Sequence, residues 1–238
     1  MFKKIPYSTH DEWLNLRKQG IGGSDAGLIM GKKQYNNKNI VDLWLEKSGK
    51  INKPNETNSA MERGHKLEPF IRQLYAIDNP DMEIKEVKEL YAHPKYDFIR
   101  ASLDGEIILP NGNIGILEIK TTTIHQYSYY KELWKNEENN DTIPENYLYQ
   151  VLHYFLVTDY DFAVLVADIR FRCFEDNSDT FDLNKQLKTY TIYKNEWMNR
   201  IEELKQKEIE FWSYVTNDIE PPYIKEYHIG IGGKYGRK

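Results

Sequence analysis

The sequence predicts a mixed α/β fold, in which helices flank one central β-sheet. Through most of the first 76 residues, apolar side chains recur every three to four positions, which is the period of an amphipathic helix. From Glu83 onward the apolar period changes to two, which is typical of half-buried strands. Residues 163–167 are continuously apolar, as expected of a strand that is covered on both faces.

The chain of 238 residues is long enough for one domain with a substantial core. We therefore predict a single domain over residues 1–238, made of N-terminal helices over residues 9–76 and a sheet core over residues 83–215. The glycine-containing tail over residues 228–238 shows no helical or strand period and is expected to be flexible.

Three short helices are predicted near the N-terminus. Thr9 and Glu12 have the spacing of a capping box, and the helix that they begin ends at a glycine. A glycine turn then precedes a second helix, for which Ser24 or Asp25 is the expected cap. A third helix is expected over residues 39–48.

A longer helix is predicted from Thr57 or Asn58 to about residue 76, with a kink or a break at Pro69. Four strands follow, and a turn over residues 110–113 joins the last two of them as a hairpin. The expected strands cover residues 83–91, 98–103, 106–109 and 114–120.

In the second half of the chain, helices and strands alternate, which indicates that strands are added to the same sheet. The expected elements are helices over residues 123–134 and 144–157, strands over residues 162–171 and 187–193, and a closing helix that Asn195 caps and that reaches about residue 215.

The composition excludes several classes of protein. A mean hydropathy of -0.72, without a long continuous apolar run, argues against a membrane protein. Cys173 is the only cysteine, so the chain cannot form an intramolecular disulfide or supply an iron–sulfur cluster. This fits the reducing cytoplasm. The net charge of -5 does not by itself indicate nucleic-acid binding, although a local basic groove is compatible with it.

The chemically most informative residues lie on the predicted hairpin. Glu118 and Lys120 are two positions apart in a strand, so both point to one face of the sheet. The hairpin returns Asp104 to the side of Glu118, and two carboxylates with one ammonium meet at the edge of the sheet. Two adjacent carboxylates raise each other's pKa unless a cation lies between them. The alternative is an ordinary surface ion pair between Glu118 and Lys120.

Mg²⁺ suits such a cluster, because it prefers hard oxygen ligands and retains several waters. Asp104, Glu118 and the backbone carbonyl of Ile119 are the candidate ligands of one or two ions, with Mn²⁺ as an alternative. A bound ion would lower the pKa of a water and stabilise charge on a phosphoryl oxygen. Lys120 is predicted to hold or to deprotonate that water.

Asp104, Glu118 and Lys120 together resemble the PD-(D/E)xK nuclease signature, with Leu103 in place of its proline. The chain resembles more specifically the YqaJ-like viral recombinases, relatives of the lambda-type phage exonuclease, which implies a restriction-endonuclease-like core. Five segments carry this resemblance in the family's order: GIGGSDA at residues 20–26, RGHKLEP at 63–69, ASLDG at 101–105, LEIKT at 117–121 and YQVLHY at 149–154.

The resemblance implies further site residues. Glu68 matches a helix acid that completes the metal site, and Gln150 matches a glutamine that orients water or a phosphate. Arg17 and Ser24 match a pair that holds the 5′-terminal phosphate. A helix N-terminus offers free N–H groups to an anion, and arginine adds bidentate hydrogen bonds. Gly22 and Gly23, which precede Ser24, are expected to let the chain approach DNA closely.

The resemblance also implies an activity. The chain is expected to be a metal-dependent 5′-to-3′ exonuclease that digests double-stranded DNA from its ends, leaving 3′ single strands for phage-type recombination. A homotrimeric ring and a single-strand annealing partner are expected, in the cytoplasm of a bacterial host. The alternatives are an endonuclease or nickase on the same fold, and a catalytically silent DNA-binding module.

Overall fold

The computed structural model describes residues 2–32, 38–51, 58–174 and 185–222. The tail over residues 228–238, for which flexibility was predicted, lies outside the described residues.

The centre of the molecule is a five-stranded mixed sheet, whose strands lie in the order β2-β5-β6-β7-β8. Strands β6 and β7 are parallel, and every other neighbouring pair in this sheet is antiparallel. The predicted α/β class and mixed central sheet are confirmed. The bounds of the strands are β2 Glu83–Lys85, β5 Gly105–Ile108, β6 Ile114–Ile124, β7 Phe162–Phe171 and β8 Lys185–Tyr193.

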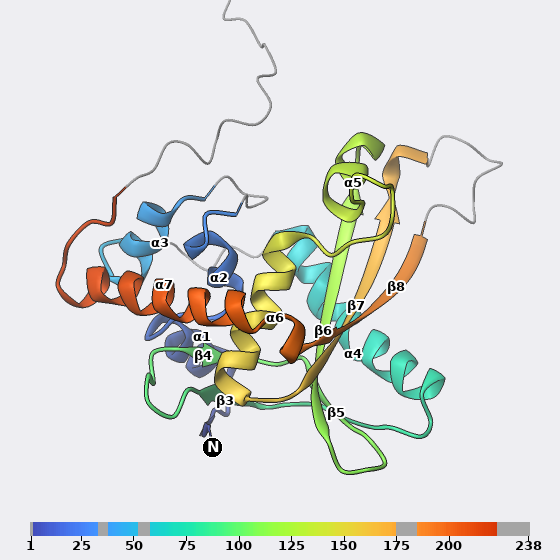
Figure 1. The fold of residues 1–238 in the computed structure, drawn as a ribbon, viewed down its shortest axis with the longest axis horizontal. Coiled ribbons are helices and arrows are strands. Elements are labelled where there is room, and N and C mark those ends of the chain that lie inside the picture. The colour runs from blue at the N-terminus through green and yellow to red at the C-terminus, as the bar shows by residue number, and fades with distance from the viewer. Residues whose placement is uncertain (1, 33–37, 52–57, 175–184, 223–238) are drawn as a thin grey trace, which may run out of the picture.

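Helices cover the two faces of the sheet (Figure 1). On one face, α4 (Ser59–Asp78) packs Ile71 and Tyr75 against Leu117 and Ile119 of β6. On the other face, α6 (Glu145–Thr158) forms a layer that is buried along almost its whole length. Because successive residues of a strand point to opposite faces, the intervening side chains of β6 point toward α6.

A second, three-stranded sheet pairs β1 (Lys3–Pro6) and β4 (Arg100–Ala101) with β3 (Glu89–Ala92), all antiparallel. It lies beside the N-terminal end of the chain in Figure 1. Strand β1 was not predicted, because four residues of which three are exposed leave little apolar pattern in the sequence.

The N-terminal helices are α1 (His10–Lys18), α2 (Gly23–Ile29) and α3 (Ile40–Lys47). The closing helix α7 (Met198–Thr216) packs against α6, and also against α2 and α3. The capping box of Thr9 is formed as predicted, and the structure shows Asn39 as the N-cap of α3. Figure 1 shows these helices gathered beside one end of α6.

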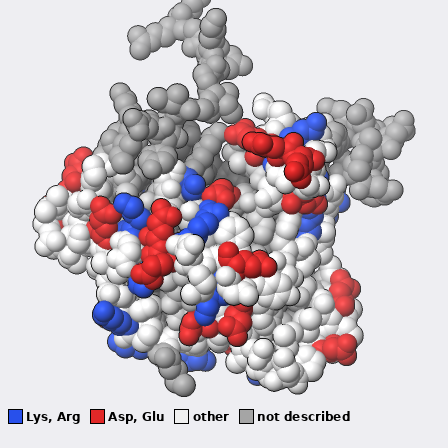
Figure 2. All heavy atoms as spheres, viewed as in Figure 1, with Lys and Arg blue, Asp and Glu red and all other residues white. Residues whose placement is uncertain are grey.

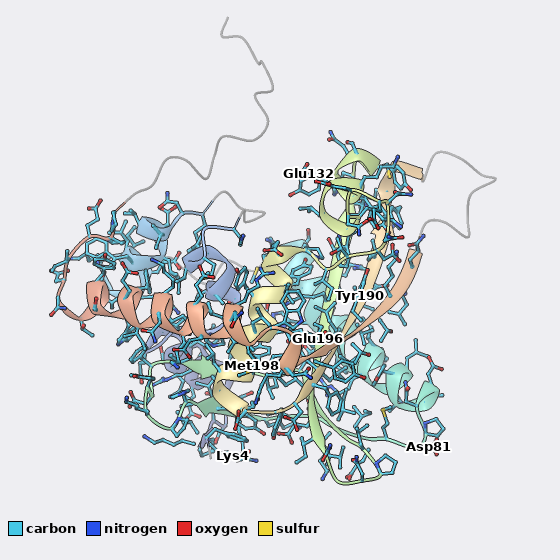
Figure 3. All side chains as sticks on the ribbon, in the orientation of Figure 1. Lys4, Asp81, Glu132, Tyr190, Glu196 and Met198 are labelled. Atoms are coloured by element: carbon cyan, nitrogen blue, oxygen red, sulfur yellow. The ribbon has the colours of Figure 1, made fainter. Side chains whose placement is uncertain are left out.

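Helix α5 (Tyr127–Trp134) follows β6 and sits at the end of the sheet (Figure 1). Trp134 is completely buried, and its ring centroid lies 6.2 Å from that of Tyr190 on β8. Figure 3 labels Tyr190 on β8 and Glu132 on α5. The structure also contains short 3₁₀ segments at Arg172–Phe174 and Lys194–Glu196.

Several predicted boundaries were wrong. Residues 83–91 form two strands in different sheets, and residues 98–103 contribute only the short β4. Strand β6 continues to Ile124, so the helix expected from residue 123 begins at Tyr127. The parallel pairing of β6 with β7, which extends to Ile124 and Phe171, explains why these polar threonine-rich residues are extended.

Two capping predictions were also wrong. The cap of α2 is Gly22, rather than Ser24 or Asp25. Asn195 lies in a 3₁₀ turn before α7, whose N-cap is Trp197. Pro69 lies inside α4 without ending it. A proline in a helix removes one backbone hydrogen bond, and the packing of α4 on the sheet outweighs that loss.

Acidic and basic side chains are interspersed on the face shown in Figure 2. Many of them are paired: Glu145 accepts from both Lys32 and Arg200, at 3.3 and 2.6 Å. No helix within the described residues is long and apolar enough to cross a membrane. Cys173 is a free thiol and partly buried.

Candidate active site

The hairpin of β5 and β6 brings Asp104 to the side of Glu118. Gly105, the first residue of β5, pairs with Leu117 of β6, so Asp104 lies next to the backbone of Glu118 and Ile119. Its Oδ2 accepts a hydrogen bond from the Ile119 amide at 2.7 Å. The predicted return of this aspartate to the LEIKT strand is therefore present.

Glu118 and Lys120 both point to the α6 side of the sheet. Lys120 Nζ lies 2.7 Å from Glu118 Oε1 and donates to Gln150 Oε1 at 2.8 Å. Gln150 Nε2 donates to the same Glu118 oxygen at 2.7 Å. The structure thus brings together three of the predicted residues, with Gln150 of α6 bridging the acid and the lysine.

The electrostatics of this cluster show an excess of negative charge. Burial, and then repulsion from Glu118 and Glu68, raise the pKa of Asp104 well above its ordinary value. Burial also raises the pKa of Glu118, although Lys120 opposes the shift. Burial lowers the pKa of Lys120, but the carboxylates of Glu118 and Asp104 outweigh it, so that this pKa is raised. The single ammonium of Lys120 therefore does not neutralise the carboxylates of Asp104 and Glu118.

The donor set fits a hard divalent cation. Glu118 is 1% exposed, and its Oε2 is a buried oxygen without a hydrogen-bond partner. A buried carboxylate oxygen of this kind is costly unless something binds it. Carboxylates beside a backbone carbonyl, such as that of Ile119, are the ligands that Mg²⁺ and Mn²⁺ prefer.

Glu68 does not point into this cluster as the residues stand. Its Oε1 accepts from Arg72 Nη2 at 2.8 Å, one turn further along α4. Among the described residues, no three His, Cys, Asp or Glu side chains form a ready metal group. Glu68 is nevertheless close enough to raise the pKa of Asp104, so it lies within electrostatic range of the proposed metal site.

Tyr154 connects the cluster to the N-terminal helices, a role that the sequence analysis missed. Gln150 Nε2 donates to the Tyr154 hydroxyl at 2.7 Å, which in turn donates to the Ser102 carbonyl at 2.9 Å. The Trp13 indole donates to the Ser102 hydroxyl at 3.1 Å. The four-residue spacing of Gln150 and Tyr154 on one helix was the signal in the sequence.

Arg17 and Ser24 are brought together at the end of this chain of contacts. Arg17 Nη2 donates to Ser24 Oγ at 3.0 Å. The Arg17 guanidinium also lies over the Trp13 ring, 4.6 Å from its centroid. Ser24 is exposed in the first turn of α2, so its side chain is accessible to an anion.

The glycines before Ser24 have different surroundings. A Cβ on Gly23 would lie 2.6 Å from the Tyr154 ring and 2.8 Å from Gln150 Cγ, so glycine is needed there for α2 to pack against α6. Gly22 has more space, and its amide donates to Asp25 Oδ2 at 3.0 Å. The contact of either backbone with DNA stays a prediction.

Two further buried charges lie outside the predicted set. His153 is completely buried, with Nδ1 2.6 Å from Glu208 Oε1 and Nε2 2.8 Å from the Arg100 carbonyl.

His65 is exposed, and its ring lies 6.5 Å from that of His10. Neither histidine is placed to bind a metal at Glu118.

A family model described as the YqaJ-like viral recombinase domain matches residues 12–161. The chain belongs to this family. The match contains every residue that the sequence analysis assigned to the site, from Arg17 to Gln150.

Relatives of the YqaJ-like chain include the uncharacterized protein YqaJ of Bacillus subtilis strain 168. The two are 35% identical over 168 residues, which cover 68% of this chain and 48% of that protein. The chain thus spans about half the length of the curated relative that it matches.

The fold is similar to that of LHK-Exo, an alkaline exonuclease from Laribacter hongkongensis. The crystal structure of LHK-Exo with dAMP matches with a TM-score of 0.62 and 22% identity, over 88% of this chain and 94% of that one. A second LHK-Exo structure gives a TM-score of 0.60, with the same identity and coverage. The expected PD-(D/E)xK fold is confirmed.

Proposed function

We propose that this YqaJ-like chain is a metal-dependent exonuclease that digests double-stranded DNA from a 5′ end and leaves a 3′ single strand. One observation carries the proposal. Asp104 and the buried Glu118 are held beside Lys120, with one Glu118 oxygen lacking a partner. A purely structural ion pair does not require a second acid with a raised pKa beside it.

The relatives support the class of reaction. LHK-Exo is described as an alkaline exonuclease and was crystallised with dAMP. At 22% identity that likeness concerns the fold, so the reaction of this chain is proposed from its own site. The intact set of two acids, a lysine and a glutamine argues against a catalytically silent DNA-binding module.

In the proposed mechanism, Asp104, Glu118, Glu68 and the Ile119 carbonyl would hold one or two Mg²⁺ or Mn²⁺ ions. When bound, such an ion supplies Lewis-acid stabilisation of the scissile phosphate and a more acidic water. The protein's part is to hold the substrate phosphodiester against this edge of the sheet and to neutralise charge there.

Lys120 and Gln150 orient the nucleophile. The Lys120 ammonium already lies among Glu118, Gln150 and the Tyr147 ring, whose centroid is 5.2 Å from Nζ. From this position the Lys120 ammonium holds the attacking water as the phosphodiester is attacked in line. Gln150 holds the side chains of Lys120 and Glu118 in fixed positions relative to each other, because its amide is hydrogen-bonded to both.

Arg17 and Ser24 bind the 5′-terminal phosphate in this proposal. The guanidinium provides charge-assisted hydrogen bonds, and the N-terminus of α2 adds N–H donors of favourable polarity. The contacts through Trp13, Ser102 and Tyr154 fix this pocket relative to Glu118. The distance between the bound 5′-terminal phosphate of the DNA and the phosphodiester that is cut is thereby constant.

The proposed assembly is a homotrimeric ring that encloses DNA in the cytoplasm of a bacterial host and supplies single strands to an annealing protein. Apolar side chains that are exposed along α4 are available for contacts between protein chains. They include Phe70, Leu74 and Ile77, at 68%, 43% and 67% exposure. Light scattering coupled to gel filtration tests the trimer.

The deciding experiment digests linear duplexes that are labelled at the 5′ or the 3′ end, with and without a 5′ phosphate, in Mg²⁺. We expect rapid release of the 5′ label from phosphorylated ends, and none from Glu118→Ala. A covalently closed circle is the control, because an endonuclease or nickase on the same fold cuts it and an exonuclease does not. Cleavage of the circle would overturn the proposal.

A further inference from the structure

Lys47, on the last turn of α3, reaches into the segment that joins α1 to α2. Its side chain is only 10% exposed, although a lysine at a helix end usually extends into water. Nζ donates to the Arg17 carbonyl at 3.2 Å and to the Gly20 carbonyl at 2.7 Å. The ammonium thus binds the backbone of a residue whose guanidinium forms the proposed phosphate pocket.

The same ammonium is paired with Asp25 on α2. Lys47 Nζ lies 2.7 Å from Asp25 Oδ2, and this oxygen also accepts from the Gly22 amide at 3.0 Å. Asp25 directly follows Ser24, the second residue of the pocket. Burial opposes ionisation of Asp25, but Lys47 and Lys38 lower its pKa to about 2, so the pair is charged at neutral pH.

A matching contact holds α1 from the other side. Arg100 Nη1 donates to the Leu16 carbonyl at 2.7 Å. The last carbonyls of a helix have no partner within the helix, and cations are favoured there. With Lys47 on Arg17 and Arg100 on Leu16, the end of α1 is fixed from two directions.

We infer that Lys47, together with Asp25, is a positioning residue for the 5′-phosphate pocket: it holds the end of α1 and the start of α2 so that Arg17 and Ser24 face each other. This inference rests on the proposed function. Lys47 is too buried to meet DNA itself, and it acts by fixing the separation of the Arg17 guanidinium and the Ser24 hydroxyl, now 3.0 Å.

The test compares Lys47→Met with the wild type on duplexes that carry a 5′ phosphate or a 5′ hydroxyl. The expected result is a roughly tenfold rise in KM for phosphorylated ends, equivalent to about 1.4 kcal/mol of binding. The KM for hydroxyl ends and kcat at saturation should change less than about twofold. A general loss of folding would alter kcat on both substrates, so this split identifies positioning.

Two further variants keep the test decisive. Lys50→Met is the matched control, because Lys50 lies beside the same helix end but contacts Asp218 and the Trp44 ring rather than the Arg17 carbonyl or Asp25. The double variant Lys47→Met with Asp25→Asn leaves no unpaired buried charge, so it serves if the single variant is unstable. It should lose the preference for phosphorylated ends to the same extent.

Arg17→Ala separates this inference from the function on which it rests. If Arg17→Ala loses the preference for phosphorylated ends while the Lys47→Met variants keep it, the positioning role is overturned and the pocket stands. If the wild type shows no such preference, or Arg17→Ala retains it, the pocket itself is absent and the inference falls with it.

Discussion

Arg63 of α4 and Asp168 of β7 form an ion pair across the face of the central sheet, with Arg63 Nη2 2.7 Å from Asp168 Oδ2. Asp168 is completely buried, and its other oxygen lies 3.3 Å from Lys185 Nζ. This pair attaches the first turns of α4 to the sheet, and with them the turn that carries Glu68.

Replacing Arg63 with Met should therefore destabilise the protein. Asp168 would keep only the distant and exposed Lys185, and a buried carboxylate without its partner is unfavourable. Because Arg63 is itself partly exposed, we expect a loss of about 2–3 kcal/mol in the free energy of unfolding, at the lower end for such pairs. Urea denaturation followed by circular dichroism measures it. Lys85→Met, which removes an exposed pair with Glu83, is the control and should change stability by less than about 0.5 kcal/mol.

Glu118→Gln should abolish activity while stabilising the metal-free protein. The variant removes a buried charge whose second oxygen has no partner, and it retains an acceptor for Lys120 and Gln150. We expect a loss of activity on the order of 1,000-fold, with a higher Tm in a chelator. Digestion of linear duplex and thermal unfolding measure the two effects. Unchanged activity would remove Glu118 from the proposed site.

Metal removal gives a third prediction. A cation bound at Asp104 and Glu118 relieves their repulsion only in the folded state, so it should raise the Tm of the wild type. At a concentration 100 times its Kd, the gain is about 2.7 kcal/mol. Titration of Mg²⁺ or Mn²⁺ in differential scanning fluorimetry should show this shift in the wild type and in Lys50→Met. The shift should be absent from Asp104→Asn, and an equal shift there would place the ion elsewhere.

The fold could be predicted from the sequence wherever one apolar period runs long enough. The buried strand at residues 162–171 agrees with β7, and the α3 boundaries follow from its two caps. Residues 83–91 could not be divided correctly, because the break between β2 and β3 depends on which sheet each joins. Tertiary pairing, rather than local propensity, decides such short strands.

The positions of the site residues on the hairpin could be predicted from the sequence, whereas the contacts of the residues that surround the hairpin could not. The alternation in LEIKT places Glu118 and Lys120 on one face, as the structure has them. The pairing of Glu68 with Arg72 depends on side-chain rotamers that no residue pattern specifies. Lys47 and Asp25 form a contact between elements that are distant in sequence, and so their link to the site was not visible there.

Gly23→Ala should weaken both the fold and the activity. The added methyl group would lie 2.6 Å from the Tyr154 ring, so α2 would have to move away from α6. Overpacking of this kind costs about 1–3 kcal/mol. Urea denaturation measures the stability, and cleavage of phosphorylated ends measures the accompanying displacement of Ser24. Gly22→Ala is the matched control for stability, since its Cβ has no neighbour closer than 3.8 Å, and an equal loss of stability there would contradict the packing explanation.

The buried His153–Glu208 pair predicts a pH-dependent stability. Burial lowers the pKa of His153, but Glu208 and the Arg100 carbonyl outweigh it, and the folded-state pKa is raised above 6.5. The stabilisation that the protonated His153 contributes to the folded protein is therefore fully present below pH 6.5, and it is lost as the pH rises through the folded-state pKa of His153. Relative to His153→Gln, the wild type should lose stability between neutral and alkaline pH, as measured by urea denaturation across that range. Parallel pH profiles for the two proteins would show that the pKa of His153 is the same in the folded and unfolded states, against this prediction.

The Trp13 indole lies beneath the Arg17 guanidinium and is hydrogen-bonded to Ser102. An anion that draws the guanidinium off the ring changes the electric field at the indole, and with it the colour and intensity of its emission. Trp13, one of five tryptophans in the chain, is thus a natural fluorophore at the place where a strand end would arrive, and the part of the emission change that Trp13→Phe removes would report occupancy without labelled DNA and without cleavage.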